Sequence, residues 1–84
     1  MKYKIEMAPL TDYYVVAVKD KGTSELKESF TLNESGADML RLFCEDKDIA
    51  EVAKEMADMY EAPIDIVTKD VERFANSLRK KGLL

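Results

Sequence analysis

Apolar and polar residues alternate through the first 32 residues, which is the pattern of β-strands with one buried face. Residues 3–8 alternate until Pro9 ends the segment. Residues 12–19 hold the densest run of β-branched and aromatic side chains and are apolar on both faces, which predicts a central strand. Residues 25–32 alternate again. We therefore expect two antiparallel hairpins that form a three-stranded sheet.

The third of these segments has a mixed inner face. The alternation assigns six of its side chains to two faces: Leu26, Phe30 and Leu32 to one, and Lys27, Ser29 and Thr31 to the other. Glu28 interrupts the apolar row. The turn before this segment contains Gly22, which is free to adopt a positive φ.

A helical period replaces the alternation at residues 32–37. Asn33 is well suited to cap the new helix, because its side-chain oxygen can accept a hydrogen bond from a free N–H in the first turn. Four apolar residues then follow the spacing of one helix face: Ala37, Leu40, Phe43 and Cys44. This helix is expected to end near residues 45–47.

Two further helices follow the first. Asp48 opens the second, with Glu51 three residues later as its partner in a capping box, and Pro63 prevents it from continuing. The third is expected over residues 64–81, with Gly82 as its C-cap. Its apolar face is formed by Val67, Val71, Phe74, Ala75 and Leu78. The order β-β-β-α-α-α predicts an α+β fold in which one sheet and three helices share one core.

The length of 84 residues indicates one domain, over residues 1–84. A net charge of −4 argues against a general nucleic-acid binder, whose affinity depends on neutralising phosphates with Lys and Arg. The chain has one cysteine and no signal peptide, and no apolar run approaches the ~20 residues of a membrane span. We therefore expect a cytoplasmic protein.

Catalysis and metal binding are not expected. The chain has no histidine, which is the commonest general base and the commonest metal ligand. Its three glycines are too scattered for a phosphate-binding loop, so no cofactor is expected either. Cys44 lies on an apolar stripe and is interpreted as a small core residue. Three methionines could form an adaptable binding surface, but core filling is favoured, because all lie on or near apolar helix faces: Met39, Met56 and Met59.

Two features of the chain suggest binding. If the strands are laid down in order, the third strand lies at a sheet edge, where its free N–H and C=O groups could accept an extended peptide. An edge that is merely protected by charge is the alternative interpretation, with Lys27 and Glu28 in that role. The third helix carries basic and acidic residues on its polar face: Lys69, Arg73, Arg79, Lys80 and Lys81 against Asp65, Asp70 and Glu72. This face could be a DNA-recognition surface in a winged helix or an ordinary solvated face, and its mixed signs favour the latter.

Several spaced segments also resemble a known family. They are Leu32-Asn33-Glu34-Ser35-Gly36-Ala37 with Met39, Leu40 and Leu42, then Ile49-Ala50-Glu51-Val52 with Met56 and Tyr60, then Asp70, Val71, Phe74, Leu78 and Gly82-Leu83-Leu84. Together they resemble the PqqD-like family, that of the pyrroloquinoline quinone (PQQ) biosynthesis protein D, from about residue 14 to residue 84. The resemblance implies a winged helix-turn-helix-like fold, which agrees with the predicted order of elements.

The resemblance also implies a function. Such domains are recognition elements for ribosomally made precursor peptides: they bind the leader as an added strand and present it to a modifying enzyme, often a radical S-adenosylmethionine (radical SAM) protein. The leader lies between the third strand and the third helix. The positions implied here are Leu26, Lys27, Glu28, Ser29, Phe30, Thr31, Val67, Lys69, Asp70, Val71, Arg73 and Phe74.

This chain departs from the family pattern at two positions. Gly36 stands where a small residue such as Ala is usual, and Glu28 makes the predicted pocket more polar. The resemblance shifts the interpretation of the edge strand from protection to peptide binding. The alternatives are a winged-helix nucleic-acid binder and a scaffold protein, and neither a membrane nor nucleic acid is an expected partner.

Overall fold

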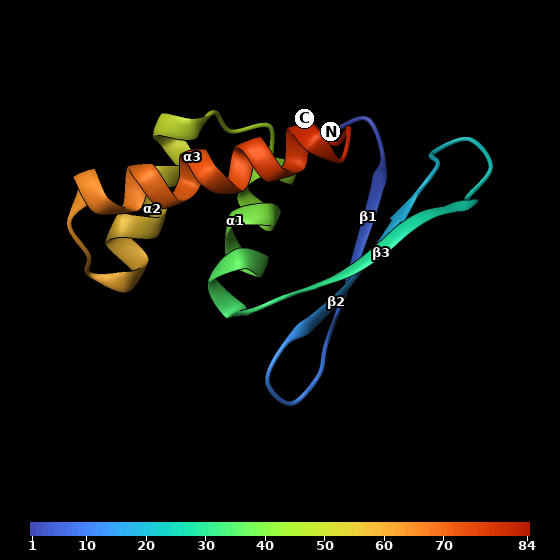
Figure 1. The fold of residues 1–84 in the computed structure, drawn as a ribbon, viewed down its shortest axis with the longest axis horizontal. Helices are drawn as coiled ribbons and strands as arrows, with labels where there is room; N and C mark the ends of the chain where they lie inside the picture. Colours follow the sequence, from blue (N-terminus) through green and yellow to red (C-terminus); the bar gives the residue numbers. More distant parts are fainter.

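The computed structural model describes residues 1–84 as a three-stranded sheet followed by three helices (Figure 1). The strands are β1 (Lys4–Pro9), β2 (Tyr14–Lys19) and β3 (Leu26–Leu32). The helices are α1 (Glu34–Cys44), α2 (Ile49–Tyr60) and α3 (Ile64–Lys80). The predicted order β-β-β-α-α-α and the predicted α+β fold are confirmed.

The sheet is antiparallel, with the strands in the order β1-β2-β3. The central strand turns Val16 and Val18 inward, and both are fully buried. The turn between β2 and β3 differs from the prediction, because its positive φ lies at Ser24 (61°) and not at Gly22. The Asp20 carboxylate accepts hydrogen bonds from the N–H groups of Gly22 (2.8 Å) and Thr23 (3.1 Å). These two bonds form an Asx-type turn over residues 20–23. The residue with the left-handed backbone, Ser24, comes directly after this turn.

The predicted N-caps of the first two helices are present. The Asn33 side chain accepts a hydrogen bond from the N–H of Gly36 at 2.8 Å. In α2, Asp48 and Glu51 form the reciprocal capping box, at 2.8 and 3.1 Å. A Cβ atom on Gly36 would lie 3.1 Å from the Asn33 oxygen, so glycine lets the cap approach closely.

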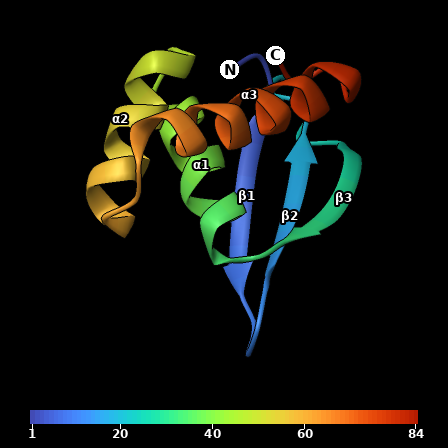
Figure 2. The same ribbon diagram turned by 60° about the vertical axis from the view of Figure 1, so that its left-hand side comes forward.

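α1 and the C-terminal part of α3 lie beside the sheet, and α2 packs on α3 away from the strands (Figure 2). The core combines residues of the sheet and of all three helices, and none of its fully buried side chains is polar or charged. After α3, Gly82 adopts a φ of 76° and the Leu83 N–H donates to the Leu78 carbonyl at 2.9 Å. This reversal buries Leu83 in the core.

The C-terminal end of α2 is more exposed than the sequence predicts. Met39 and Met56 fill the core, but Met59 is exposed, so the prediction of core filling is wrong for Met59. Tyr60 is also exposed, and its hydroxyl donates to the Asp38 carboxylate of α1 at 2.6 Å. Both residues lie in the last turn of α2, and their side chains reach the surface there.

Candidate peptide-binding edge and its helical wall

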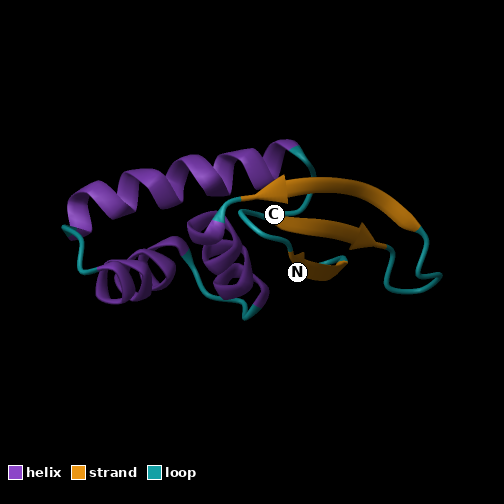
Figure 3. Ribbon diagram, turned by 90° about the horizontal axis from the view of Figure 1, so that it is seen from below, coloured by secondary structure: helices purple, strands orange, loops and turns teal.

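The edge of β3 is the candidate site, because it combines free backbone groups with a neighbouring helix. β3 pairs with β2 on one side and has no strand on the other. An unpaired edge exposes alternate N–H and C=O groups that an extended chain can bind. Figure 3 shows β3 and α3 on the same side of the molecule, whereas β1 forms the opposite edge. The predicted edge position of the third strand is confirmed.

A β-bulge in β3 changes which side chains of the strand point to each face of the sheet. Its register with β2 pairs Glu28 with Val18 but Leu26 with Lys19, so Lys27 is the extra residue. Partners across a ladder project to the same face, so Leu26 turns outward with Lys19 and is 56 % exposed. The expectation that Leu26 shares a face with Phe30 is therefore wrong. The side chains that β3 turns toward the helices are Glu28, Phe30 and Leu32, all partly buried.

Contacts between Lys81 and β3 hold the C-terminal end of α3 beside the strand. We call the side of α3 that carries Asp70, Phe74 and Lys81 the α3 wall. The Lys81 ammonium at the end of α3 lies 2.9 Å from the Glu28 carboxylate and 4.6 Å from the centre of the Phe30 ring. Asp70, Phe74 and Lys81 are spaced four and seven residues apart, so they project from one side of α3. That side therefore faces β3. Sequence reasoning assigned Lys81 to the polar face of α3 and missed this role, because its partners are more than 50 residues away in the chain.

The other predicted α3 residues differ in burial and in the side of the helix from which they project. Val67 and Val71 are buried in the core beneath the wall. Phe74 is half-buried and stacks on Phe43 of α1, with ring centroids 6.4 Å apart. At about 100° per residue, Lys69 projects from the side of α3 opposite the core, and it is exposed.

The polar groups of this region are mostly paired. Arg73 projects from α3 further from β3 than Asp70 does. Its guanidinium lies 3.4 Å from the Asp70 carboxylate, and both side chains are exposed. Arg79 donates to the Asn76 side chain at 2.7 Å. Together with the Lys81–Glu28 pair, these contacts engage three of the basic side chains that could have formed a phosphate-binding surface.

Two hollows flank α3. The smaller, about 160 Å³, lies between the start of α1 and the turn that joins α2 and α3, and is lined by Ser35, Met39, Met56, Tyr60, Ala62, Val67 and Asp70. Ser35 lies three residues after the end of β3 and Asp70 lies on the β3 side of α3, so this hollow is found beyond the C-terminal end of β3. Sequence reasoning did not predict it, because its lining comes from three separate helices and the turn between two of them.

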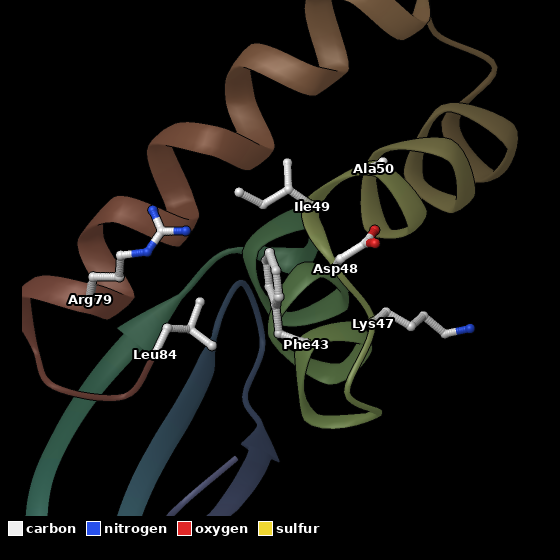
Figure 4. A pocket seen from close by; sticks show the side chains of 7 residues that line it. All are labelled: Phe43, Lys47, Asp48, Ile49, Ala50, Arg79 and Leu84. Atoms are coloured by element: carbon white, nitrogen blue, oxygen red, sulfur yellow. The ribbon is translucent and has the colours of Figure 1, made fainter.

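The larger hollow, about 520 Å³, lies on the other side of α3 (Figure 4). Its lining residues are Phe43, Lys47, Asp48, Ile49, Ala50, Arg79 and Leu84. Asp48 is engaged as the cap of α2, and Lys47 extends away from the hollow toward Glu55, 3.1 Å away. Its polar groups therefore already have partners.

The pKa values of Cys44 and Tyr60 are raised, which disfavours the deprotonated forms that act as nucleophiles or bases. Burial raises the pKa of the Cys44 thiol, and this outweighs the opposing effect of the N-terminal ammonium. The hydrogen bond to Asp38 raises the pKa of Tyr60 to about 12. No group of three His, Cys, Asp or Glu residues is placed to hold a metal ion, and none of the helices combines the length and the apolar character that crossing a membrane requires.

The chain belongs to the PqqD family, because the family model described as coenzyme PQQ synthesis protein D matches residues 15–84. A solved structure of TbiB1 in complex with the TbiA(β) leader peptide has a similar fold, with a TM-score of 0.71 and 24% sequence identity. The similarity covers 100% of this chain and 94% of TbiB1. None of the curated proteins matches the chain. These findings confirm the resemblance predicted from the sequence.

Proposed function

We propose that this protein is a non-catalytic chaperone that binds the leader of a ribosomally made precursor peptide and presents it to a modifying enzyme of the radical SAM type. It would act in the cytoplasm as one domain, over residues 1–84, and without a cofactor. The observation that carries the proposal is the free edge of β3 beside α3 in a member of the PqqD family. The leader bound to TbiB1, a protein of similar fold, supports it.

Strand addition would give the complex its affinity and its specificity. Backbone groups of the leader would pair with the free groups of β3, and alternate leader side chains would point under α3. There they would meet Phe30 and Phe74, with Glu28 and Lys81 at one end of the cleft. We retain the whole predicted set, residues 26–31 and the six α3 positions, as proposed contacts. Within it, Val67 and Val71 would support the wall, and Lys69 would act only at its outer border.

Titration of the isotope-labelled protein with candidate leader peptides tests the site. Amide shifts are expected to cluster in residues 25–32 and 64–78. Shifts concentrated in β1, or spread evenly over the chain, would contradict the proposed cleft. A peptide with the same composition in scrambled order serves as the ligand control.

Two matched charge variants make the test specific. Glu28→Lys and Glu6→Lys each remove a partly exposed carboxylate that forms an ion pair. Glu28 lies 2.9 Å from Lys81, and Glu6 lies 2.6 Å from Lys19 and 3.6 Å from Lys4. Glu28 faces the cleft, whereas Glu6 lies on the outer face of the sheet in β1. We expect Glu28→Lys to change leader affinity several-fold and Glu6→Lys to leave it unchanged. Equal effects would point to general electrostatics.

The nucleic-acid alternative makes a different prediction. A winged-helix binder would bind duplex DNA with a steep dependence on salt. The net charge of −4 and the pairing of Arg73, Arg79 and Lys81 within the protein disfavour it. A gel shift at low salt distinguishes the two functions.

A further inference from the structure

The turn between α2 and α3 carries an exposed apolar surface that the peptide site does not use. Four large apolar side chains in eight residues are exposed: Met59 by 53%, Tyr60 by 45%, Ile64 by 51% and Ile66 by 57%. They make up half of the eight large exposed apolar residues in the chain. We call these four residues the tip patch. Single exposed apolar residues are ordinary, but a group of them marks an interaction surface.

The core gives no reason for the apolar side chains of Met59, Ile64 and Ile66, which are all exposed. Ile66 has a lower helix propensity than Glu or Lys, which would suit an exposed position in α3. Met59 extends from the last turn of α2 beyond the core. Tyr60 differs from the other three, because its hydroxyl donates a hydrogen bond to Asp38.

The segment that carries the tip patch, residues 55–68, also carries the net charge of the protein; we call this segment the tip. Residues 55–68 contain Glu55, Asp58, Glu61 and Asp65 but no Lys or Arg. Outside this segment, 13 acidic residues balance the 13 basic ones, so the whole net charge of −4 belongs to the tip. Glu55 is paired with a lysine, whereas Asp58, Glu61 and Asp65 form no ion pair.

The tip is convex, and of the four residues of the tip patch Tyr60 reaches back toward the end of β3, through its bond to Asp38 and the hollow that it lines with Ser35. Ile64 and Ile66 project from α3 about 160° apart, so the patch wraps around the tip and does not form a flat stripe. The α2–α3 turn occupies one end of the long axis of the molecule, and the sheet lies toward the other (Figure 1). A partner that holds the tip would leave the β3 edge open.

We propose that the tip patch docks into a concave apolar groove with a basic rim on the modifying enzyme. This inference rests on the proposed function and adds the surface that the enzyme would recognise. Charge complementarity selects this occupant, because unpaired carboxylates surround the patch. A second copy would bring two acidic tips together, and an anionic membrane surface would repel the tip.

The test uses two pairs of substitutions in the full chain. Met59→Ser with Ile64→Ser removes apolar area, and Glu61→Lys with Asp65→Lys reverses the charge. Tyr60 is kept because of its bond to Asp38, and Ile66 is kept because it lies nearer the β3 side of α3. The control, Leu10→Ser with Tyr13→Ser, removes two exposed apolar residues at the β1–β2 turn, 51% and 44% exposed.

Binding is measured by calorimetry to two probes: a purified radical SAM modifying enzyme and a synthetic precursor leader, both from the source organism of this protein. We expect each tip variant to weaken enzyme binding about tenfold or more, with leader affinity unchanged and the control unaffected. Enzyme binding by the tip variants within twofold of the unmodified protein, or no enzyme binding by the unmodified protein, overturns the inference. Loss of self-association or of vesicle binding in place of enzyme binding also overturns it. Failure of the unmodified protein to bind the leader contradicts the proposed function instead, so the two failures are distinct.

Discussion

The contact of Lys81 with β3 predicts a measurable coupling between the sheet and α3. The Lys81–Glu28 ion pair is 34% exposed on each side, so it contributes about 0.2–1 kcal/mol. The ammonium over the Phe30 ring, at 4.6 Å, adds about 0.5–1 kcal/mol. Lys81→Met removes both contacts and is expected to lower the free energy of unfolding by about 1–1.5 kcal/mol. Glu28→Gln removes only the ion pair and is expected to cost about 0.5 kcal/mol.

A double-mutant cycle measured by urea unfolding isolates the pair. The cycle of Glu28→Gln and Lys81→Met is expected to give a coupling of about 0.5 kcal/mol that shrinks in high salt. The same cycle for Glu6 and Lys19, on the outer face of the sheet, serves as the control for an ion pair that joins only β1 and β2. A Lys81→Met variant as stable as the unmodified protein would refute the reasoning. It would mean that Lys81 does not hold the end of α3 against β3.

Three further predictions concern the helices. Because the pKa of Tyr60 is about 12 in the folded protein against 10.0 ordinarily, its bond to Asp38 stabilises the fold below pH 10, and that stability is lost as the pH rises toward 12. Urea unfolding from pH 8 to 11 should show this loss, and Tyr60→Phe should remove it. Gly36→Ala should destabilise by about 0.5–1 kcal/mol despite its better helix propensity, because the new Cβ would crowd the capping oxygen of Asn33; a gain of about 1 kcal/mol would refute this. Asp48→Ala should cost about 1 kcal/mol in thermal or urea unfolding, through loss of the capping box, and an unchanged midpoint would count against that role.

The sequence predicted the elements well because their signals are local. The alternation of β1 and β3, the Asn33 cap and the capping box of α2 each depend on residues within a few positions of one another. The position of the positive φ in the β2–β3 turn was missed, because the Asp20 side chain and not glycine determines the shape of that turn. The outward turn of Leu26 was also missed, since a bulge shifts the register without changing the apolar pattern.

The candidate site was less predictable, because its geometry depends on contacts between distant segments. Asp70 and Phe74 could be placed on one side of a helix, but the sequence does not show which strand that side meets. Lys81 establishes it through contacts with β3. The exposure of Met59 was missed for a similar reason, since an apolar position near a helix end is buried only where a neighbouring element reaches it.

Hydrogen exchange with and without a bound leader tests the central claim most directly, because strand addition protects edge amides. Alternate N–H groups of β3 point away from β2 and are free in the unbound protein. The proposed function predicts that leader binding slows exchange at alternate residues within 26–32 and leaves β1 unchanged. Unchanged exchange along β3, or protection that develops along β1 instead, would contradict it.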